Sequence, residues 1–300
     1  KGLPGAIVRE YAAILCQELG LRATARRLRT PYRRPALPRQ VHGTQQKLPS
    51  GIASTPLNAT PAIIETGNER QLQFSSHSLQ TRMRLDDPYA LIAGYTRQMM
   101  SFLLFDPDPE HVLLIGLGGG SHAKFCYRYL SKARITAVEI DERVIAMRDA
   151  FFIPPDDDRF RIVHDDGARY LYRCEAPVSA ILIDAFDQDG VTPALASAAF
   201  FERAAALLSS KGVLIMNLHG ERRHFAEHVK RAGEVFGARA MLVPVTGNDN
   251  VLLYAFAPGS APPSARHLYL RARHLQSKMP LNFRHYLKLI REGESLSASA

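Results

Sequence analysis

The sequence has only three cysteines, Cys16, Cys126 and Cys174, which lie far apart in the chain. An odd cysteine count without a Cys-x-x-Cys pair argues against a disulfide framework and against a zinc site. No apolar run approaches the roughly 18 residues that a membrane-spanning helix needs. No segment has the pattern of a signal peptide, so we expect a cytoplasmic protein without a membrane span.

Acidic side chains are scarce at the start of the chain. Residues 1–50 contain ten Lys or Arg and two acids, so they carry +8 of the formal net charge of +9. The remaining 250 residues carry only +1, which argues against a nucleic-acid-binding core. Prolines recur in 31–61, so we interpret residues 1–60 as a basic extension and linker. A targeting or membrane-surface helix within residues 1–30 is the alternative.

Residues 111–141 have the pattern of a strand, a tight turn, a helix and a second parallel strand. An apolar run at 112–115 stops at a glycine cluster, and a second apolar segment ends at Glu139. The cluster consists of Gly116, Gly118, Gly119 and Gly120. Glycines let the backbone approach a ligand, and an acid at the second strand's end accepts hydrogen bonds from ribose hydroxyls. Gly118 and Glu139 are 21 residues apart, close to the roughly 20 expected, so we predict a nucleoside site.

Strand and helix patterns alternate from residue 111 onward. The predicted strands are 112–115, 134–138, 161–164, 178–183, 212–217, 239–244 and 250–256. Such alternation predicts an α/β fold whose mostly parallel, Rossmann-like sheet is covered on both faces. The last two strands are too close together for a helical crossover, so we expect them to pair antiparallel.

The same patterns predict four regions. Residues 1–60 form the extension, and 61–106 form a small β-domain with a connecting helix at 88–105. Residues 107–258 form the nucleoside-binding domain, and 259–300 form C-terminal helices.

Two acidic clusters follow predicted strands. Asp165 and Asp166 precede Gly167, where one acid can bind an adenine amino group or cap the next helix. Asp184, Asp187 and Asp189 follow a buried strand, where acids can accept a proton or bind a cation. We expect no metal, because no His or Cys lies at a helpful spacing. We also expect His122 to lie at the surface.

Four motifs follow one another along the chain: Gly-Leu-Gly-Gly-Gly at 116–120, Val-Glu-Ile-Asp at 138–141, Asp-Asp-Gly at 165–167 and Asp-x-x-Asp at 184–187. In this order they resemble the spermidine synthase superfamily, the polyamine aminopropyltransferases, over about residues 60–258. The resemblance implies a class I methyltransferase-like sheet and a transferase of polyamine biosynthesis. The co-substrate would be decarboxylated S-adenosylmethionine or S-adenosylmethionine itself, the partner a small amine, and the assembly a homodimer.

The resemblance also implies roles for individual residues. Asp184 would be the general base, and Asp187 would hold the amine. The donor would be bound by Gly116, Gly118, Gly119, Glu139 (ribose), Asp166 (adenine) and Gln80.

Three departures concern amine recognition. Gly119 stands where the family typically has an aspartate that contacts the donor's aminopropyl amine. The usual Tyr-His-Glu region reads Ala-Gly-Tyr-Thr-Arg at 93–97, and the late tyrosine loop is replaced at 244–250. The chain therefore resembles a divergent branch. A methyltransferase, a non-catalytic nucleoside-binding protein and, more distantly, an NAD-dependent dehydrogenase stay open as alternatives.

Overall fold

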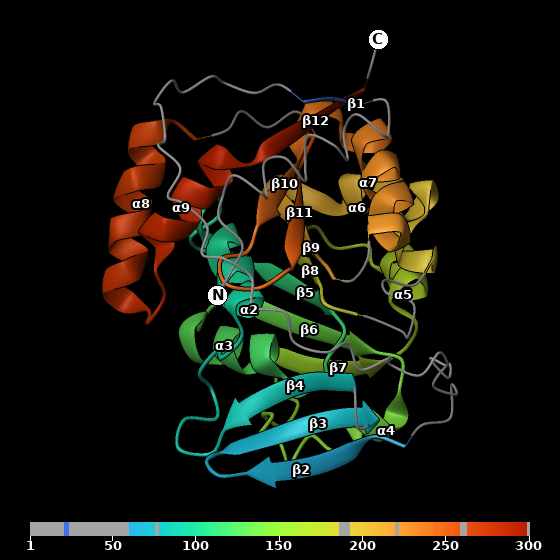
Figure 1. Ribbon diagram of the computed structural model, residues 1–300, viewed down its shortest axis with the longest axis vertical. Coiled ribbons are helices and arrows are strands. Elements are labelled where there is room, and N and C mark those ends of the chain that lie inside the picture. The colour runs from blue at the N-terminus through green and yellow to red at the C-terminus, as the bar shows by residue number, and fades with distance from the viewer. Residues whose placement is uncertain are drawn as a thin grey trace, which may run out of the picture.

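The computed structural model describes residues 21–23, 60–75, 78–185, 193–219, 222–258 and 263–298. They form one large sheet flanked by helices and one small sheet beside it (Figure 1). The large sheet consists of β1 (Leu21–Ala23), β5 (His111–Ile115), β6 (Arg134–Glu139), β7 (Phe160–His164), β8 (Val178–Ile183), β9 (Leu208–Leu218), β10 (Ala240–Pro244), β11 (Val251–Phe256) and β12 (Glu294–Ala298). The small sheet consists of β2 (Ala62–Thr66), β3 (Glu69–Ser75) and β4 (Ser78–Arg84).

The topology confirms the predicted fold class. The large sheet has the order β1-β12-β10-β11-β9-β8-β5-β6-β7. Strands β9, β8, β5, β6 and β7 are parallel, whereas β11 pairs antiparallel with both β9 and β10. All seven strands predicted beyond residue 111 are present. Strands β1 and β12 were not predicted; they extend the antiparallel edge.

The helices and 3-10 turns connect these strands. They are α2 (Gly94–Met99), η1 (Met100–Leu104), α3 (Ser121–Tyr129), α4 (Glu142–Ile145), α5 (Gly167–Arg173), η2 (Pro193–Ala196), α6 (Ala198–Leu207), α7 (Arg222–Phe236), η3 (Gly237–Arg239), α8 (Ala265–Lys278) and α9 (Phe283–Glu292). None of the described helices combines the length and the apolar character that a bilayer crossing demands.

The connecting helix predicted at 88–105 is shorter than expected. The chain first makes a turn, in which the Ala90 N–H donates to the Asp87 carbonyl at 3.1 Å. The helix α2 begins only at Gly94 and continues as η1. Proline is favoured at the second residue of a β-turn and at the first position of a helix, so Pro88 alone did not distinguish the two.

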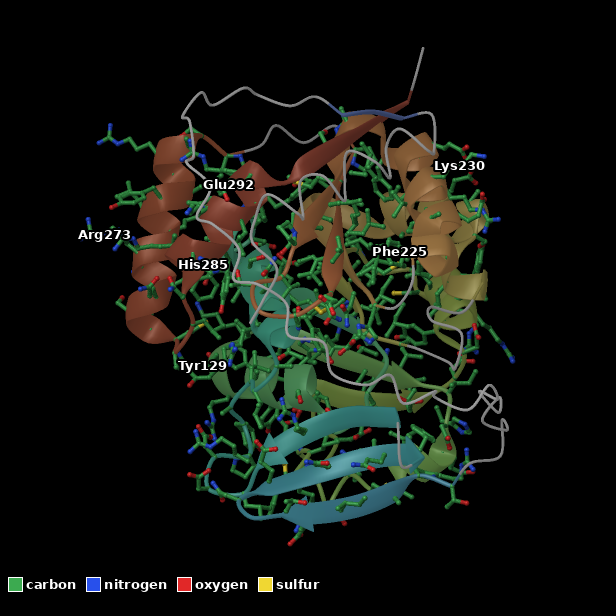
Figure 2. The ribbon with its side chains drawn as sticks, viewed as in Figure 1. Tyr129, Phe225, Lys230, Arg273, His285 and Glu292 are labelled. Atoms are coloured by element: carbon green, nitrogen blue, oxygen red, sulfur yellow. The ribbon has the colours of Figure 1, made fainter. Side chains whose placement is uncertain are left out.

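Alternating residues of each parallel strand face two separate cores. In β5, Val112 and Leu114 pack with α3, η1, α8 and α9, whereas Leu113 and Ile115 pack with α5, α6 and α7. The same alternation continues in β8 and β9, as a period of two requires. Phe225 on α7 points toward the sheet and Lys230 points away from it (Figure 2). The nearly continuous apolar strands are thus explained by helices on both faces.

A buried lysine joins the small sheet to the large one. Lys124 on α3 is only 1% exposed, and its Nζ donates to the Phe151 carbonyl at 2.7 Å and to Met83 Sδ on β4 at 3.1 Å. Burial lowers the pKa of Lys124 to about 7. The ammonium group therefore loses much of its charge near neutral pH.

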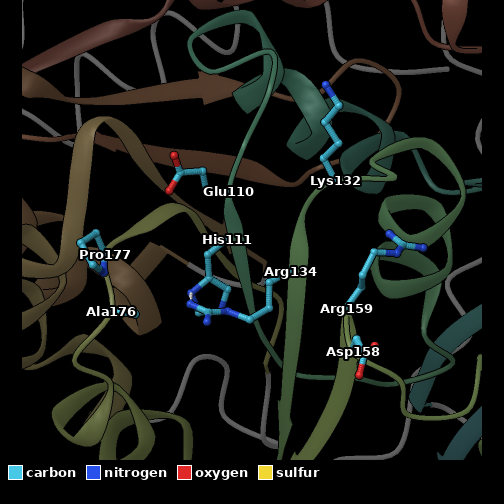
Figure 3. Close-up of a pocket in the computed structure, with 8 residues that line it drawn as sticks. All are labelled: Glu110, His111, Lys132, Arg134, Asp158, Arg159, Ala176 and Pro177. Carbon is cyan, nitrogen blue, oxygen red and sulfur yellow. Dashed lines mark hydrogen bonds between the residues drawn. The ribbon is translucent and has the colours of Figure 1, made fainter.

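A hollow of about 320 Å³ opens at the edge of the large sheet where its parallel strands begin (Figure 3). It is lined by Glu110, His111, Lys132, Arg134, Asp158, Arg159, Ala176 and Pro177. The His111 ring bonds to Arg134 through Nδ1 and to the Thr136 hydroxyl through Nε2, each at 3.1 Å. Burial, then the charges of Arg134 and Arg161, lower the pKa of His111 to about 4. The ring is therefore neutral at pH 7, and its hydrogen bonds give it a structural role. It lies at the sheet edge opposite the predicted nucleoside site.

The lowered pKa of Lys124 predicts that the stability of the protein depends on pH. An unfolded lysine keeps its proton to about pH 10.4, whereas folded Lys124 releases it near 7. The unfolded state therefore binds more protons between pH 7 and 10, so the free energy of unfolding should rise across that window. We expect Lys124 to contribute on the order of 4 kcal/mol to the rise in unfolding free energy between pH 7 and pH 10. Urea unfolding at these two pH values measures the rise, and Lys124→Met should abolish this contribution.

The exposed Lys132 offers the matched control, since Lys132→Met should leave the pH dependence of the wild-type chain unchanged. An equal pH dependence in wild type and Lys124→Met would contradict the assignment.

Candidate active site

The glycine turn after β5 lies directly against the end of β8. The Gly116 N–H donates to the Val138 carbonyl at 2.9 Å, and the Asp184 N–H donates to the Ile115 carbonyl at 2.9 Å. Gly116 has φ +95°, and a Cβ there would lie 2.4 Å from the Asp184 carbonyl oxygen. Only glycine fits both this conformation and this contact. The predicted nucleoside loop and the predicted base therefore meet at one edge of the sheet.

Glu139, at the end of β6, holds the glycine turn in place. Its Oε2 accepts a hydrogen bond from the Leu117 N–H at 2.9 Å. Its Oε1 accepts from the N–H groups of Ile140 at 2.9 Å and Asp141 at 3.0 Å. A carboxylate has about four lone-pair sites, so one remains on Oε2. Asp141 caps α4 by accepting from Arg143 N–H, as its position predicted.

Asp184 follows β8 and is oriented by two buried asparagines. Its Oδ1 accepts a hydrogen bond from Asn217 Nδ2 on β9 at 3.0 Å. The Asn217 Oδ1 in turn accepts from Asn250 Nδ2 at 2.8 Å. The Tyr95 hydroxyl on α2 also hydrogen-bonds to Asp184; burial, and secondarily this carboxylate, raise the pKa of Tyr95. The Asp184 side chain remains 19% exposed, so one side of it can meet a ligand.

His122 is buried, so the expectation of a surface position was wrong. It lies in the first turn of α3 and is 8% exposed. Its Nδ1 lies 3.8 Å from Asp184 Oδ2. The glycine turn carries the chain directly into α3, which turns this ring toward the end of β8.

Gly119 packs where no side chain fits. A Cβ at this position would lie 2.2 Å from Thr81 Cγ2 on β4 and 2.9 Å from Phe151 Cδ1. Both distances are below any ordinary carbon contact. An aspartate therefore has no room here, which gives a physical reason for the departure noted in the glycine motif.

Asp166 acts as the N-cap of α5 in this structure. Its Oδ1 accepts a hydrogen bond from the Arg169 N–H at 2.8 Å. The neighbouring Asp165 pairs with Arg173. The helix-cap interpretation is therefore confirmed for Asp166, and its assignment to the adenine stays a prediction.

Two predicted residues have no described side chain. Gln80 lies on β4, next to Thr81, and nothing is described of its side-chain contacts. Asp187 lies outside the described residues. Their assignment to the site stays a prediction.

Sequence reasoning missed Tyr95, Asn217 and Asn250. A tyrosine in the region where Tyr-His-Glu was expected was a usable signal for Tyr95. Asn217 lies one residue before the end of β9 and Asn250 directly precedes β11, but no motif marked them. In the described part of the chain, no group of three or more His, Cys, Asp or Glu side chains is arranged to hold a metal ion.

Comparison with known proteins identifies the family. The spermine/spermidine synthase domain matches residues 93–245. The polyamine aminopropyltransferase of Chromobacterium violaceum is 37% identical over 237 residues, which cover 79% of this chain and 91% of that protein. The chain belongs to the spermine/spermidine synthase family. It is therefore a transferase, as the resemblance implied.

Solved structures of the same fold include a probable spermidine synthase and a methyltransferase-like protein. A probable spermidine synthase from Corynebacterium glutamicum aligns with a TM-score of 0.58 at 18% identity, covering 72% of this chain and 83% of that one. Human methyltransferase-like protein 13, in complex with SAH, aligns with a TM-score of 0.56 at 20% identity, covering 66% and 93%. At these identities the likeness establishes the fold alone.

The contact at Gly119 predicts a non-additive pair of substitutions. Gly119→Ala should destabilise the protein by about 1–3 kcal/mol, because the new methyl group overlaps Thr81 and Phe151. Thr81→Ser removes the overlapping Cγ2, so the double variant should recover part of that loss. Urea unfolding of the wild type, both single variants and the double variant measures the coupling. Strictly additive free energies would show that the two residues do not compete for this space.

Proposed function

We propose that this family member transfers an aminopropyl group from decarboxylated S-adenosylmethionine to a polyamine acceptor, with Asp184 as general base. The observation that carries the proposal is the contact between Gly116 and the Asp184 carbonyl. It puts a carboxylate, oriented by Asn217, beside the loop that would bind the nucleoside. The named relatives support the same activity.

The chemistry requires a base at this position. The donor is a sulfonium, whose carbon next to the positive sulfur is attacked in line by an amine. An alkylamine has a pKa near 10, like lysine, so it arrives with a proton that blocks its lone pair. Asp184 would accept that proton through Oδ2, because Oδ1 is bound by Asn217. Its negative charge would also attract the cationic acceptor.

The donor would lie across the carboxyl ends of β5, β6 and β7. Glu139 would bind the ribose through the lone-pair site left on Oε2, and Asp166 would bind the adenine. Gly116, Gly118 and Gly119 would let the backbone approach the donor, with Gln80 at its other side. Asp187 would hold the acceptor amine.

Methyl transfer is the second candidate, and one observation favours it. Thr81 and Phe151 fill the space beside Gly119, so no aspartate is available there for an aminopropyl amine. Intact S-adenosylmethionine carries a carboxylate at that end of the molecule and does not need such a partner. Competition binding of the intact and decarboxylated donors separates the two: preference for the decarboxylated donor supports aminopropyl transfer, and preference for the intact one supports methyl transfer.

Asp184→Asn tests the assigned base. The amide cannot accept the amine's proton, so turnover should fall by about 10²- to 10⁴-fold, the usual contribution of a general base. Donor affinity should change little, because no predicted donor contact is removed. Steady-state aminopropyl transfer and equilibrium donor binding measure the two effects.

Asp158→Asn is the matched control, since Asp158 is exposed at the opposite edge of the sheet. Wild-type turnover in Asp184→Asn, or equal losses in both variants, would contradict the role of Asp184.

A homodimer would use the small sheet. All five residues of β2 are exposed, among them Ile63 at 39% and Ile64 at 41%. An exposed edge strand offers unpaired backbone groups to another chain. This edge supports the predicted dimer.

A further inference from the structure

The mechanism above leaves one buried imidazole unused beside the base. The Nδ1 of His122 lies 3.8 Å from Asp184 Oδ2, and the ring is 8% exposed. Its Nε2 has no hydrogen-bond partner among the residues that the structure describes. A buried polar atom without a partner costs about 1–3 kcal/mol, so a ring kept in this state calls for a functional reason.

The two oxygens of Asp184 face different neighbours. Oδ1 is bound by Asn217, which is itself bound by Asn250. Oδ2 is the oxygen that lies nearest to His122. A proton accepted on Oδ2 therefore lies on the side of Asp184 that faces the imidazole, and the two side chains have to approach from 3.8 Å to hydrogen-bond distance for it to move on.

A carboxylate alone is a poor acceptor for this proton. The amine has a pKa near 10 and an ordinary aspartate one near 3.9, so transfer is unfavourable by about six pKa units. An ordinary imidazole, with a pKa near 6.5, would reduce that deficit by about 2.6 units, or roughly 400-fold in the equilibrium. Burial lowers the pKa of His122, so the gain from this ring is smaller than that limit. A second acceptor beside Asp184 would make a larger fraction of the bound amine reactive.

We propose that Asp184 and His122 together take up the proton of the acceptor amine; this rests on the proposed aminopropyl transfer. The N–H bond of the ammonium breaks and its proton moves to Asp184 Oδ2, then on to His122 Nδ1. The freed nitrogen lone pair forms the new C–N bond while the C–S bond breaks and its electrons stay on sulfur. The imidazolium releases the proton to water after the products leave.

Burial keeps the ring of His122 unprotonated before the amine binds. Burial lowers the pKa of His122, while the charge of Asp184 and the Thr96 carbonyl raise it by less, so the ring is neutral at pH 7. Tyr95, which hydrogen-bonds to Asp184, is a further titratable group at this pair. Lys124, also on α3, donates instead to the Phe151 carbonyl.

The test uses His122→Asn, because an amide is also polar but cannot accept the proton of Asp184. At pH 7, kcat/KM for the acceptor should fall by about 100-fold. The deficit should shrink as the pH approaches 10, where the acceptor arrives already deprotonated. It should also shrink at pH 7 with acceptors whose amines have lower pKa values.

A merely structural role would lower kcat/KM equally at every pH and for every amine, and this result would overturn the proposal. Unchanged kcat/KM in His122→Asn would overturn it as well. His274→Asn, on the exposed face of α8, is the matched control and should behave as wild type. If the wild-type chain transfers no aminopropyl group to any amine, the proposed function itself has failed. A pH-independent deficit beside an active wild type overturns only the role of His122.

Discussion

The site depends on the contact between a glycine without a side chain and the carbonyl of the residue that would be the base. Any Cβ at Gly116 would overlap Asp184, so the glycine turn and the end of β8 can meet only in this form. Glu139 then fixes the turn from the other side through the Leu117 N–H. The predicted nucleoside loop and a carboxylate are thereby held at one sheet edge by backbone geometry, which loses little freedom when a ligand binds.

Much of this edge could be predicted from the sequence, and the reason is periodicity. Apolar strands of regular length end at Gly116, Glu139 and Asp184, and parallel strands bring their ends together. What could not be predicted depends on tertiary packing. Asn217 and Asn250 become a chain of hydrogen bonds to Asp184 only because β9 and β11 are neighbours in space. The burial of the His122 ring also depends on tertiary packing, which places the first turn of α3 beside the end of β8. The edge strands β1 and β12 also went unpredicted, because short segments carry too little pattern.

The small sheet packs against the loop that is predicted to bind the donor. Thr81 of β4 closes the space beside Gly119, and Met83 of the same strand lies on the buried Lys124. Gly119, which departs from the family's glycine motif, is thus in contact with β4, the strand that leaves no room for an aspartate there. The division into domains, the roles of all the predicted site residues, and the cytoplasmic setting stay predictions. The family, the fold and the transferase class are established by the comparisons and by the topology.

The most direct measurement is mass spectrometry of the products. The wild-type chain would be incubated with decarboxylated S-adenosylmethionine, and separately with S-adenosylmethionine, in the presence of putrescine, spermidine and other short amines. We predict an amine heavier by one aminopropyl unit with the decarboxylated donor and no modified amine with the intact one. An amine heavier by a methyl group with S-adenosylmethionine, and no aminopropyl product, would contradict the account.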